Sequence, residues 1–449
     1  MRMPTHRTPP GPALISWRRR SHRIGDTPSR TEPLLPVRVR IGTLPSIAAL
    51  VSLISFSLPW GSGAFDVGLG PIGGLSIIGM SACALAAFHI ARCGWRNGAY
   101  VMMLLVLALT FWAWASVMWA TDYGLAVTTV FELTQALVLV GLLSLLTQGG
   151  GEARWPVQAY VWGCIATTVA LGWQLWTHPT GLTYRLDGFG RTANDLALVL
   201  IAGGPLAGLF ALRTSRVLLR CVYVAFVCTV PAVIMLTGSR GVAVALLAQF
   251  IVVLGLGAGR LPTLPTLRKR WARIMPVTLL AGAGMFWISK QTITRWSMPF
   301  DRITSLLEGG VADIGGRERI WRVGWDAWLE SPFLGSGAGA MRTLTERATA
   351  ASVSSHNTPL GMLVELGLPG LVLFALMWAA ALWCTWRLHG PERVLVGVSL
   401  IGIGVGMLSL SLETNRMLYF MLLIPWLLAS PAEGASRSGG ETVIPRTPV

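Results

Sequence analysis

The sequence predicts an all-α polytopic membrane protein with about 12 transmembrane helices and one long external loop that contains amphipathic helices. The composition is the first observation behind this prediction: 53% of the 449 residues are hydrophobic, 12% are charged, and the mean hydropathy is +0.60. Soluble proteins carry about 25% charged residues, so an ordinary cytosolic protein is excluded. The second observation is that apolar windows of about 20 residues, long enough to cross a bilayer, recur along most of the chain.

These apolar windows define the domain organisation. They lie at residues 41–60, 70–91, 99–120, 125–147, 155–177, 194–212, 217–236, 241–259, 274–289, 362–386, 394–411 and 417–430. The windows at 274–289 and 417–430 are short. Together with the external loop at 290–361, all the windows form one predicted transmembrane domain over residues 41–430.

Both ends of the chain lack apolar periodicity. Residues 1–40 are rich in Arg and Pro, and residues 431–449 contain Gly, Ser and Pro, so we expect two disordered cytoplasmic tails. Placing both ends in the cytoplasm puts most of the 36 basic residues on that side, as the positive-inside rule requires. This predicts a multi-pass protein of the cytoplasmic (inner) membrane. The basic N-terminal tail either sets this topology or contacts anionic membrane lipids.

The basic residues are scattered between the windows rather than gathered on one soluble face, so no nucleic-acid partner is predicted. The sequence also lacks a clustered set of His and carboxylate residues that would bind a cation. The glycine-rich run Gly335–Gly339 lacks the preceding strand that a nucleotide-binding loop requires, and it is interpreted as a turn. We therefore predict no metal and no cofactor.

The external loop at 290–361 is the natural place to look for chemistry, because loops of this length are usually functional. Residues 317–330 have the pattern of an amphipathic helix that ends before Pro332. At about 100° per residue, Arg317 shares one face with three tryptophans, Trp321, Trp325 and Trp328. If this stripe lies at the bilayer interface, Arg317 is aimed inward at a site. Alternatively, Arg317 snorkels at the edge of the packing face.

Three further arginines lie at predicted external positions, where the positive-inside rule disfavours them. Arg185 and Arg191 precede Asn194 at the start of the sixth window, and Arg240 lies in a tight turn between the seventh and eighth. Such arginines need an anion. It is either a phosphate, which a guanidinium binds with two parallel hydrogen bonds, or a protein carboxylate such as Asp187, Asp195 or Glu413.

Glu132 lies inside the fourth window. An ionisable side chain within the membrane is a candidate functional residue by default. The alternative is a packing role in which Gln135, three residues on, shares its hydrogen bonds.

An ordered set of short motifs runs through the second half of the chain. Each motif is common, but together and in this order they are specific: Gly190-Arg191-Thr192-Ala193-Asn194, Ser239-Arg240-Gly241, Arg317-x-x-x-Trp321, Pro332-Phe333-Leu334-Gly335, His356-Asn357 and Glu365-Leu366-Gly367-Leu368-Pro369-Gly370. The set resembles the signature of the O-antigen ligase family, which includes related lipid-linked polysaccharide polymerases. The resemblance extends from about Arg185 to Trp426.

The resemblance implies a GT-C-like membrane glycosyltransferase that uses an undecaprenyl-pyrophosphate-linked glycan as donor and works without a metal. The acceptor is a glycan, a lipid or a protein. Carried over by position, Arg240 and Arg317 would hold the pyrophosphate, with Arg191 as a third ligand, and His356 would act near the acceptor hydroxyl. The further candidates are Arg185, Asn194, Glu365 and Glu132.

The residue chemistry agrees with this implication. A polyprenyl pyrophosphate is already a good leaving group, so the transition state mainly needs its growing negative charge neutralised, which fixed arginines can do. Histidine changes charge near neutral pH, so His356 could take the proton of the acceptor as a general base. A single displacement would invert the anomeric centre. In the alternative interpretation, His356 only caps the tenth helix beside Asn357.

We therefore expect an outward-facing glycan transferase, either a ligase or a polymerase. The alternative from another class is a transporter or flippase of lipid-linked or amphipathic cargo. A transporter needs polar groups along a path through the membrane, whereas Glu132 is nearly alone there, and the chain lacks the internal repeat of many transporters. A sensor or assembly scaffold is the third possibility.

Overall fold

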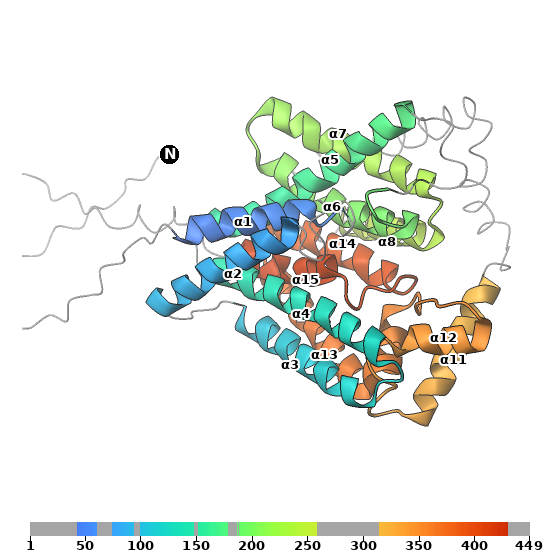
Figure 1. The fold of residues 1–449 in the computed structure, drawn as a ribbon. Helices are drawn as coiled ribbons and strands as arrows, with labels where there is room; N and C mark the ends of the chain where they lie inside the picture. The colour runs from blue at the N-terminus through green and yellow to red at the C-terminus, as the bar shows by residue number, and fades with distance from the viewer. Residues whose placement is uncertain are drawn as a thin grey trace, which may run out of the picture. The chain divides into compact units, whose positions relative to one another are not determined.

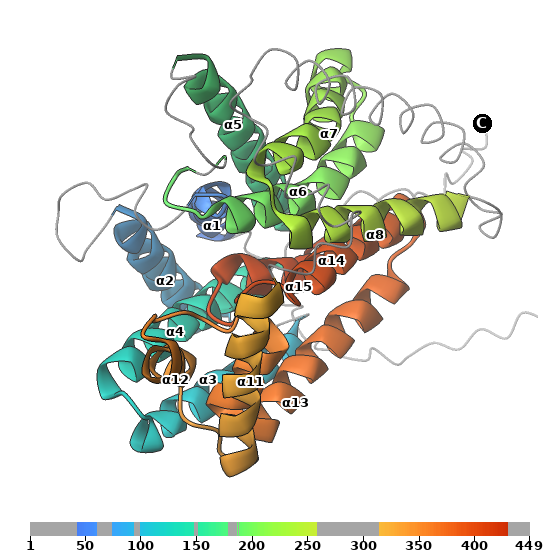
Figure 2. The same cartoon turned by 90° about the vertical axis from the view of Figure 1, so that its right-hand side faces the viewer.

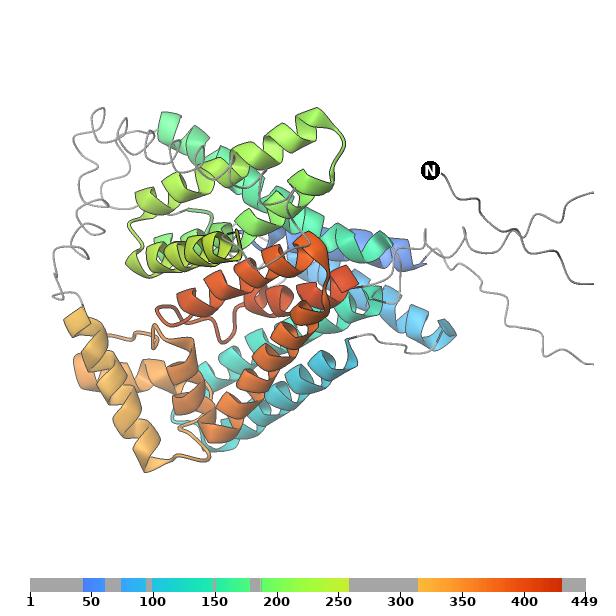
Figure 3. The same cartoon turned by 180° about the vertical axis from the view of Figure 1, so that it is seen from behind.

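The computed structural model describes residues 43–60, 74–93, 99–147, 151–177, 186, 188–257 and 314–429. These residues all belong to one compact unit, Gly42–Val449. Their regular structure is helical apart from an isolated bridge between Gly188 and Arg191 (Figures 1 and 3). The two predicted tails, the window at 274–289 and the first part of the external loop lie outside the described residues.

Within the described ranges, eight α-helices precede the external loop. They are α1 (Thr43–Ser57), α2 (Gly74–Cys93), α3 (Tyr100–Ser116), α4 (Tyr123–Leu146), α5 (Trp155–Thr177), α6 (Ala193–Arg213), α7 (Val217–Thr237) and α8 (Arg240–Gly257). Five helices are described within or after the loop: α11 (Ile314–Glu330), α12 (Ala340–Thr349), α13 (Thr358–Arg387), α14 (Gly390–Gly406) and α15 (Arg416–Ala429). Each predicted window that falls in the described ranges coincides with one of these helices.

The described part of the chain contains 5 helices that are long and apolar enough to cross a membrane: Tyr100–Trp119, Tyr123–Leu146, Ala193–Arg213, Val217–Thr237 and Thr358–Arg387. Shorter apolar helices occupy other predicted windows, at Leu44–Ser57, Ile78–Ile90, Arg240–Gly255 and Arg416–Ala429. The prediction of a polytopic helical membrane protein therefore agrees with the structure. The full set of twelve crossings and the GT-C-like arrangement stay predictions.

Helix α6 lies in the centre of the bundle, where it packs against α5, α7, α8 and α14 (Figure 2). Within its apolar window 83% of the residues are buried, as expected for a helix that is hydrophobic on all sides. Close packing explains its glycines, because a Cβ on Gly203 would lie 2.8 Å from the Cys164 sulfur. The short helix α15 is also largely buried, and it packs against α4, α13 and α14.

Helix α13 starts earlier than the predicted window at 362–386 and is kinked. Asn357 is its N-cap, with the side-chain oxygen accepting from Leu360 N at 3.1 Å, which stabilises the extra turn. At Gly367 the backbone has φ 66° and ψ −167°, outside the helical region. The break leaves three backbone carbonyls free to accept hydrogen bonds from outside the helix. Val364 O accepts from Ser336 N at 2.8 Å, and Glu365 O accepts from Gly337 N at 3.0 Å. Leu366 O accepts from Trp112 Nε1 at 2.8 Å.

Replacing Gly367 by alanine should destabilise the protein. A non-glycine residue in this backbone region costs on the order of 1–3 kcal/mol, and the added Cβ would overlap the Phe333 carbonyl. We expect a lower Tm for the detergent-purified variant. The matched control is Gly397→Ala in α14, where the nearest atom to the new Cβ is Thr385 Cγ2 at 3.8 Å. Equal Tm values for the two variants would contradict the proposed strain at Gly367.

Helices α11 and α12 lie over the start of α13 (Figures 1 and 2). The predicted amphipathic helix is thus present, and it begins at Ile314. Ala327 of α11 packs with Met341 of α12 and Val364 of α13 in a small separate core. Because Gly324 and Ala327 face this core, Trp325 is left 49% exposed.

Candidate functional site

Several chain segments meet at one end of the bundle, where α1 and α7 end and α4, α6, α8, α13 and α15 begin. Hydrogen bonds tie these ends together, and the loop between α14 and α15 is central to them. The Thr358 backbone N–H at the start of α13 donates to Met407 O at 2.9 Å, and the Thr358 hydroxyl donates to Leu410 O at 2.7 Å. The same hydroxyl accepts from Leu412 N at 2.9 Å. The α14–α15 loop therefore holds the segment that carries His356.

His356 has a left-handed backbone, with φ 48°, which is uncommon for a residue with a side chain. Its backbone N–H donates to Ser411 Oγ at 2.9 Å, and Ser411 Oγ lies 3.0 Å from Ser355 Oγ. The capping role at α13 belongs to Asn357. The His356 side chain is therefore not the helix cap that the alternative interpretation supposed.

The electrostatic surroundings of His356 favour the neutral imidazole. Burial lowers the pKa of His356 below its ordinary value of 6.5, the positive charge of Arg317 lowers the pKa further, and Asp195 opposes both effects. No described residue forms a hydrogen bond with its buried Nδ1 atom. A neutral imidazole at pH 7 is able to accept a proton.

The arginines of α11 differ as the helical periodicity predicted. Arg317 is half-buried and close enough to His356 to act on its charge. By contrast, Arg319 and Arg322 are exposed: Arg319 donates to Ala348 O at 2.9 Å, and Arg322 pairs with Glu318 at 3.1 Å. Of the three arginines, Arg317 is therefore the one whose charge acts on the histidine.

Arg240 begins α8 and follows a turn in which Gly238 is left-handed, with φ 59°. The next residue, Gly241, packs so closely on Ser409 of the α14–α15 loop that a Cβ there would overlap the serine side chain. The start of α8 thus lies against the same loop that binds the His356 backbone. This arrangement brings Arg240, Arg317 and His356 to one end of the bundle.

A polar cavity of about 440 Å³ opens at this end. Its wall combines residues from the end of α1, from α4, from the turn before α6 and the start of α6, and from the α14–α15 loop and the start of α15. It is lined by Ile54, Ser57, Leu58, Trp60, Glu132, Gln135, Gly190, Arg191, Asp195, Ser411, Thr414, Asn415, Arg416 and Met417. Two predicted site residues, Arg191 and Glu132, therefore face a shared space, and Ser411 connects that space to His356.

Arg191 also joins two segments of the fold. Its Nε and Nη2 atoms donate to the carbonyl oxygens of Pro59 at 2.9 Å and of Leu58 at 2.5 Å. Burial lowers the pKa of Arg191, whereas the charge of Asp195 opposes this shift. Asp195 is held in turn by the Thr192 hydroxyl, which donates to it at 2.7 Å.

The remaining predicted residues that the structure describes do not line this cavity. Glu365 is buried and accepts a hydrogen bond from Gly339 N at 2.9 Å, so its carboxylate supports the start of α12. Asn194 is in the first turn of α6. Arg185 and Asp187 lie outside the described residues.

Glu413 was considered as a counter-anion for the external arginines. Its carboxylate lies against Gly361 of α13. Burial, and secondarily the nearby Glu365, raise the pKa of Glu413 to about 8. Burial and Glu365 both disfavour the charged form of Glu413, whereas Asp195 interacts electrostatically with Arg191, so Asp195 is the better counter-anion.

Two residues of this site were missed in the sequence. Arg416 lines the cavity. Like Arg240, it is an arginine at the predicted external end of an apolar window, so the same sequence signal could have identified it. Ser411 carries no local signal, because its role depends on the approach of a segment more than 50 residues earlier in the chain.

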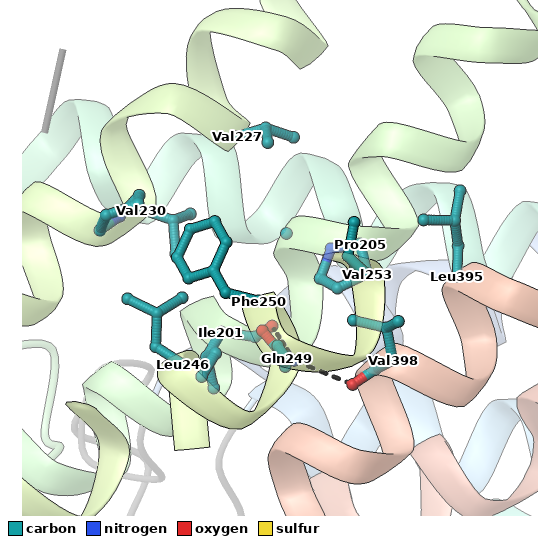
Figure 4. Close-up of a pocket in the computed structure, with 12 residues that line it drawn as sticks. Ile201, Pro205, Val227, Val230, Leu246, Gln249, Phe250, Val253, Leu395 and Val398 are labelled. Atoms are coloured by element: carbon teal, nitrogen blue, oxygen red, sulfur yellow. Dashed lines mark hydrogen bonds between the residues drawn. The ribbon is translucent and has the colours of Figure 1, made fainter. Parts of the chain in front are cut away.

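Two further hollows in the described part of the chain share no lining residue with this cavity. One is an apolar pocket between α6, α7, α8 and α14, which contains Phe250 (Figure 4). Gln249 beside it is buried and donates to Ile201 O at 3.2 Å and to Val398 O at 3.0 Å, which joins three helices. The other is a cleft of about 540 Å³ between α11 and α13, lined in part by Trp321 and Trp325.

The apolar helices and the polar site at their ends indicate an integral membrane protein with a cationic, histidine-containing centre. Residues 224–375 match the family model described as O-antigen ligase. This match agrees with the family resemblance found in the sequence, and it indicates membrane glycan transfer of the ligase or polymerase type. The matched region contains Arg240, Arg317, His356 and Glu365. The comparison with curated proteins found no match.

Proposed function

We propose that the protein is a membrane glycosyltransferase that moves a glycan from a polyprenyl-pyrophosphate donor to an acceptor hydroxyl. The reaction takes place at the outer face of the cytoplasmic membrane. The family match over residues 224–375 supports the reaction class. One observation carries the proposal: the charge of Arg317 acts on the half-buried His356. The loop that binds the His356 backbone also packs against the start of α8, which carries Arg240.

Two arginines are assigned to the leaving group. As the bond between the anomeric carbon and the diphosphate oxygen breaks, its electron pair moves to the diphosphate. Arg240 and Arg317 neutralise this charge, and guanidinium groups suit phosphate oxygens because they donate parallel hydrogen bonds. Arg191 adds a third positive charge. Its guanidinium N–H groups that do not donate to the Leu58 and Pro59 carbonyls can bind the diphosphate. Because arginines supply the positive charge, the proposed reaction is metal-independent.

His356 is assigned to the acceptor. The acceptor oxygen forms the new bond to the anomeric carbon, and its proton passes to the imidazole. The lowered pKa of His356 keeps the imidazole neutral and ready to accept the proton at pH 7. Because the acceptor attacks opposite the leaving diphosphate in one displacement, the anomeric configuration inverts.

The proposal is tested by reconstituting the full chain in proteoliposomes with a polyprenyl-pyrophosphate-linked glycan and a membrane extract as the source of acceptor. Mass spectrometry should detect the glycan covalently attached to an acceptor. Passage of the lipid-linked glycan across the bilayer without a covalent product would overturn the proposal and favour a transporter.

The same measurement on surface glycans of a deletion strain separates two forms of the activity. Shortened chains indicate that the acceptor is another glycan and that the protein is a polymerase. Complete chains that remain on the carrier lipid indicate a ligase with a lipid or protein acceptor.

A further inference from the structure

The polar cavity beside His356 has balanced charge. Glu132, Asp195, Arg191 and Arg416 all line it, and Arg416 and Glu132 are close enough to interact electrostatically. An additional diphosphate would meet two carboxylates here, which repel it. A neutral ligand that is rich in hydroxyl groups meets no such repulsion. The cavity is thus better suited to sugar rings than to the charged part of the donor.

The wall of the cavity presents both types of hydrogen-bonding group. The carboxylates only accept, the guanidinium groups only donate, and the amides of Gln135 and Asn415 do both. Within the described ranges, the side chains of Glu132, Gln135 and Arg416 make no hydrogen bond to another protein group. These three side chains are therefore available to a ligand in the cavity.

Trp60 adds a fixed aromatic surface to the same cavity. Its Nε1 atom donates to Thr167 Oγ1 at 2.7 Å, and its ring stacks on Phe189 with centroids 6.3 Å apart. These contacts hold the orientation of the indole. A sugar ring has apolar C–H faces and a polar edge, so a cavity that combines an aromatic ring with hydroxyl-binding side chains matches its two kinds of surface.

The cavity also lies next to the proposed reaction centre. Ser411 lines it and accepts the hydrogen bond from the His356 backbone at 2.9 Å. Asp195 lines it too, and its charge acts on the His356 imidazole. Because Glu132 lies about two turns inside α4, the cavity extends from His356 into the bundle.

We infer that this cavity binds the sugar residue adjacent to the bond being formed or broken, with Glu132, Gln135 and Arg416 as the residues that determine sugar specificity. The inference rests on the proposed glycan transfer, and it assigns the part of the cavity around Glu132, Gln135 and Arg416 to a neutral sugar, whereas Arg191 stays assigned to the diphosphate. The sugar belongs either to the donor or to the acceptor, and the test separates these two sources.

The test compares the binding of two probes to the detergent-purified full chain: farnesyl diphosphate, which carries no sugar, and lipid-linked glycan isolated from the host membrane. For a donor sugar, Glu132→Gln and Arg416→Gln should each weaken binding of the lipid-linked glycan by about tenfold and leave farnesyl diphosphate binding unchanged. Arg240→Gln should weaken both. The double variant Glu132→Gln/Arg416→Gln keeps the charge balanced and provides a second measurement if a single variant folds poorly.

Matched controls are Glu318→Gln and Arg322→Gln, because these residues form an exposed ion pair on α11. If the cavity binds the acceptor sugar, the cavity variants keep normal donor binding but raise the KM for acceptor in the transfer assay by about tenfold. Two outcomes would overturn the inference: equal weakening of both probes, or no change in either donor binding or acceptor KM.

Failure of the inference is distinguishable from failure of the proposed function. Donor binding is measured without turnover, so it reports on the cavity even if no covalent product forms. If the wild-type protein transfers glycan while the cavity variants behave normally, the function stands and the sugar site is rejected. If sugar-dependent binding is lost in the variants but the wild-type protein makes no product, the site stands and the transfer reaction is rejected.

Discussion

Replacing His356 by alanine is expected to reduce kcat/KM for glycan transfer by about 10²- to 10⁴-fold, the range over which a general base contributes. The protein should still fold, because the contacts that fix this segment are made by the His356 backbone with Ser411 and by the Asn357 cap, not by the imidazole. Transfer is measured by mass spectrometry with a lipid-linked donor. The Tm of the purified variant is measured in parallel.

The pH dependence gives an independent test of the role of His356. A general base must be unprotonated, and burial together with Arg317 lowers the pKa of His356. Activity should therefore persist as the pH falls from 8 to about 6.5 and decline only below that value. The matched control is His389→Ala, since His389 is an exposed histidine that follows the other end of α13. Wild-type turnover in His356→Ala would refute the assignment.

The parts of the fold that the sequence predicted are those with a strong local pattern. The apolar windows coincide with helices in the described ranges because each long apolar run must satisfy its backbone internally in a membrane. The amphipathic pattern at 317–330 likewise predicted α11, including the difference between Arg317 and its neighbours. Boundaries were less accurate, since the start of α13 depends on the Asn357 side chain rather than on hydrophobicity.

The parts that were not predicted depend on contacts between distant segments. Glu365 is a site candidate by sequence, yet the break at Gly367 brings the loop after α11 onto α13, and the carboxylate then supports the start of α12. Arg191 was expected to bind an anion, either a phosphate or a protein carboxylate, but it also donates to the carbonyls of Leu58 and Pro59 just after α1. Hydrophobic periodicity contains no information on which distant segments contact Glu365 or Arg191, because both contacts are set by tertiary packing.

The expected effect of Arg317→Gln is a loss of about 10²- to 10³-fold in kcat/KM, the usual cost of removing one donor that stabilises developing negative charge. This loss follows from the half-buried position of Arg317 beside His356. Removing its charge should also raise the pKa of His356, since Arg317 lowers it. The decline of activity at acid pH should therefore begin at a higher pH in the variant than in the wild-type protein.

Arg319→Gln is the matched control, because Arg319 lies two residues away on the same helix. Arg319 is exposed and donates to Ala348 O at 2.9 Å, so its replacement should lower the Tm slightly and leave kcat/KM and the pH profile unchanged. If Arg317 had a purely structural role, Arg317→Gln and Arg319→Gln would differ in Tm, but both would keep the wild-type pH profile. Only a half-buried guanidinium near His356 can act on both the leaving group and the base. Equal losses of activity in the two variants would therefore contradict the assignment of Arg317, and not Arg319, to the reaction centre.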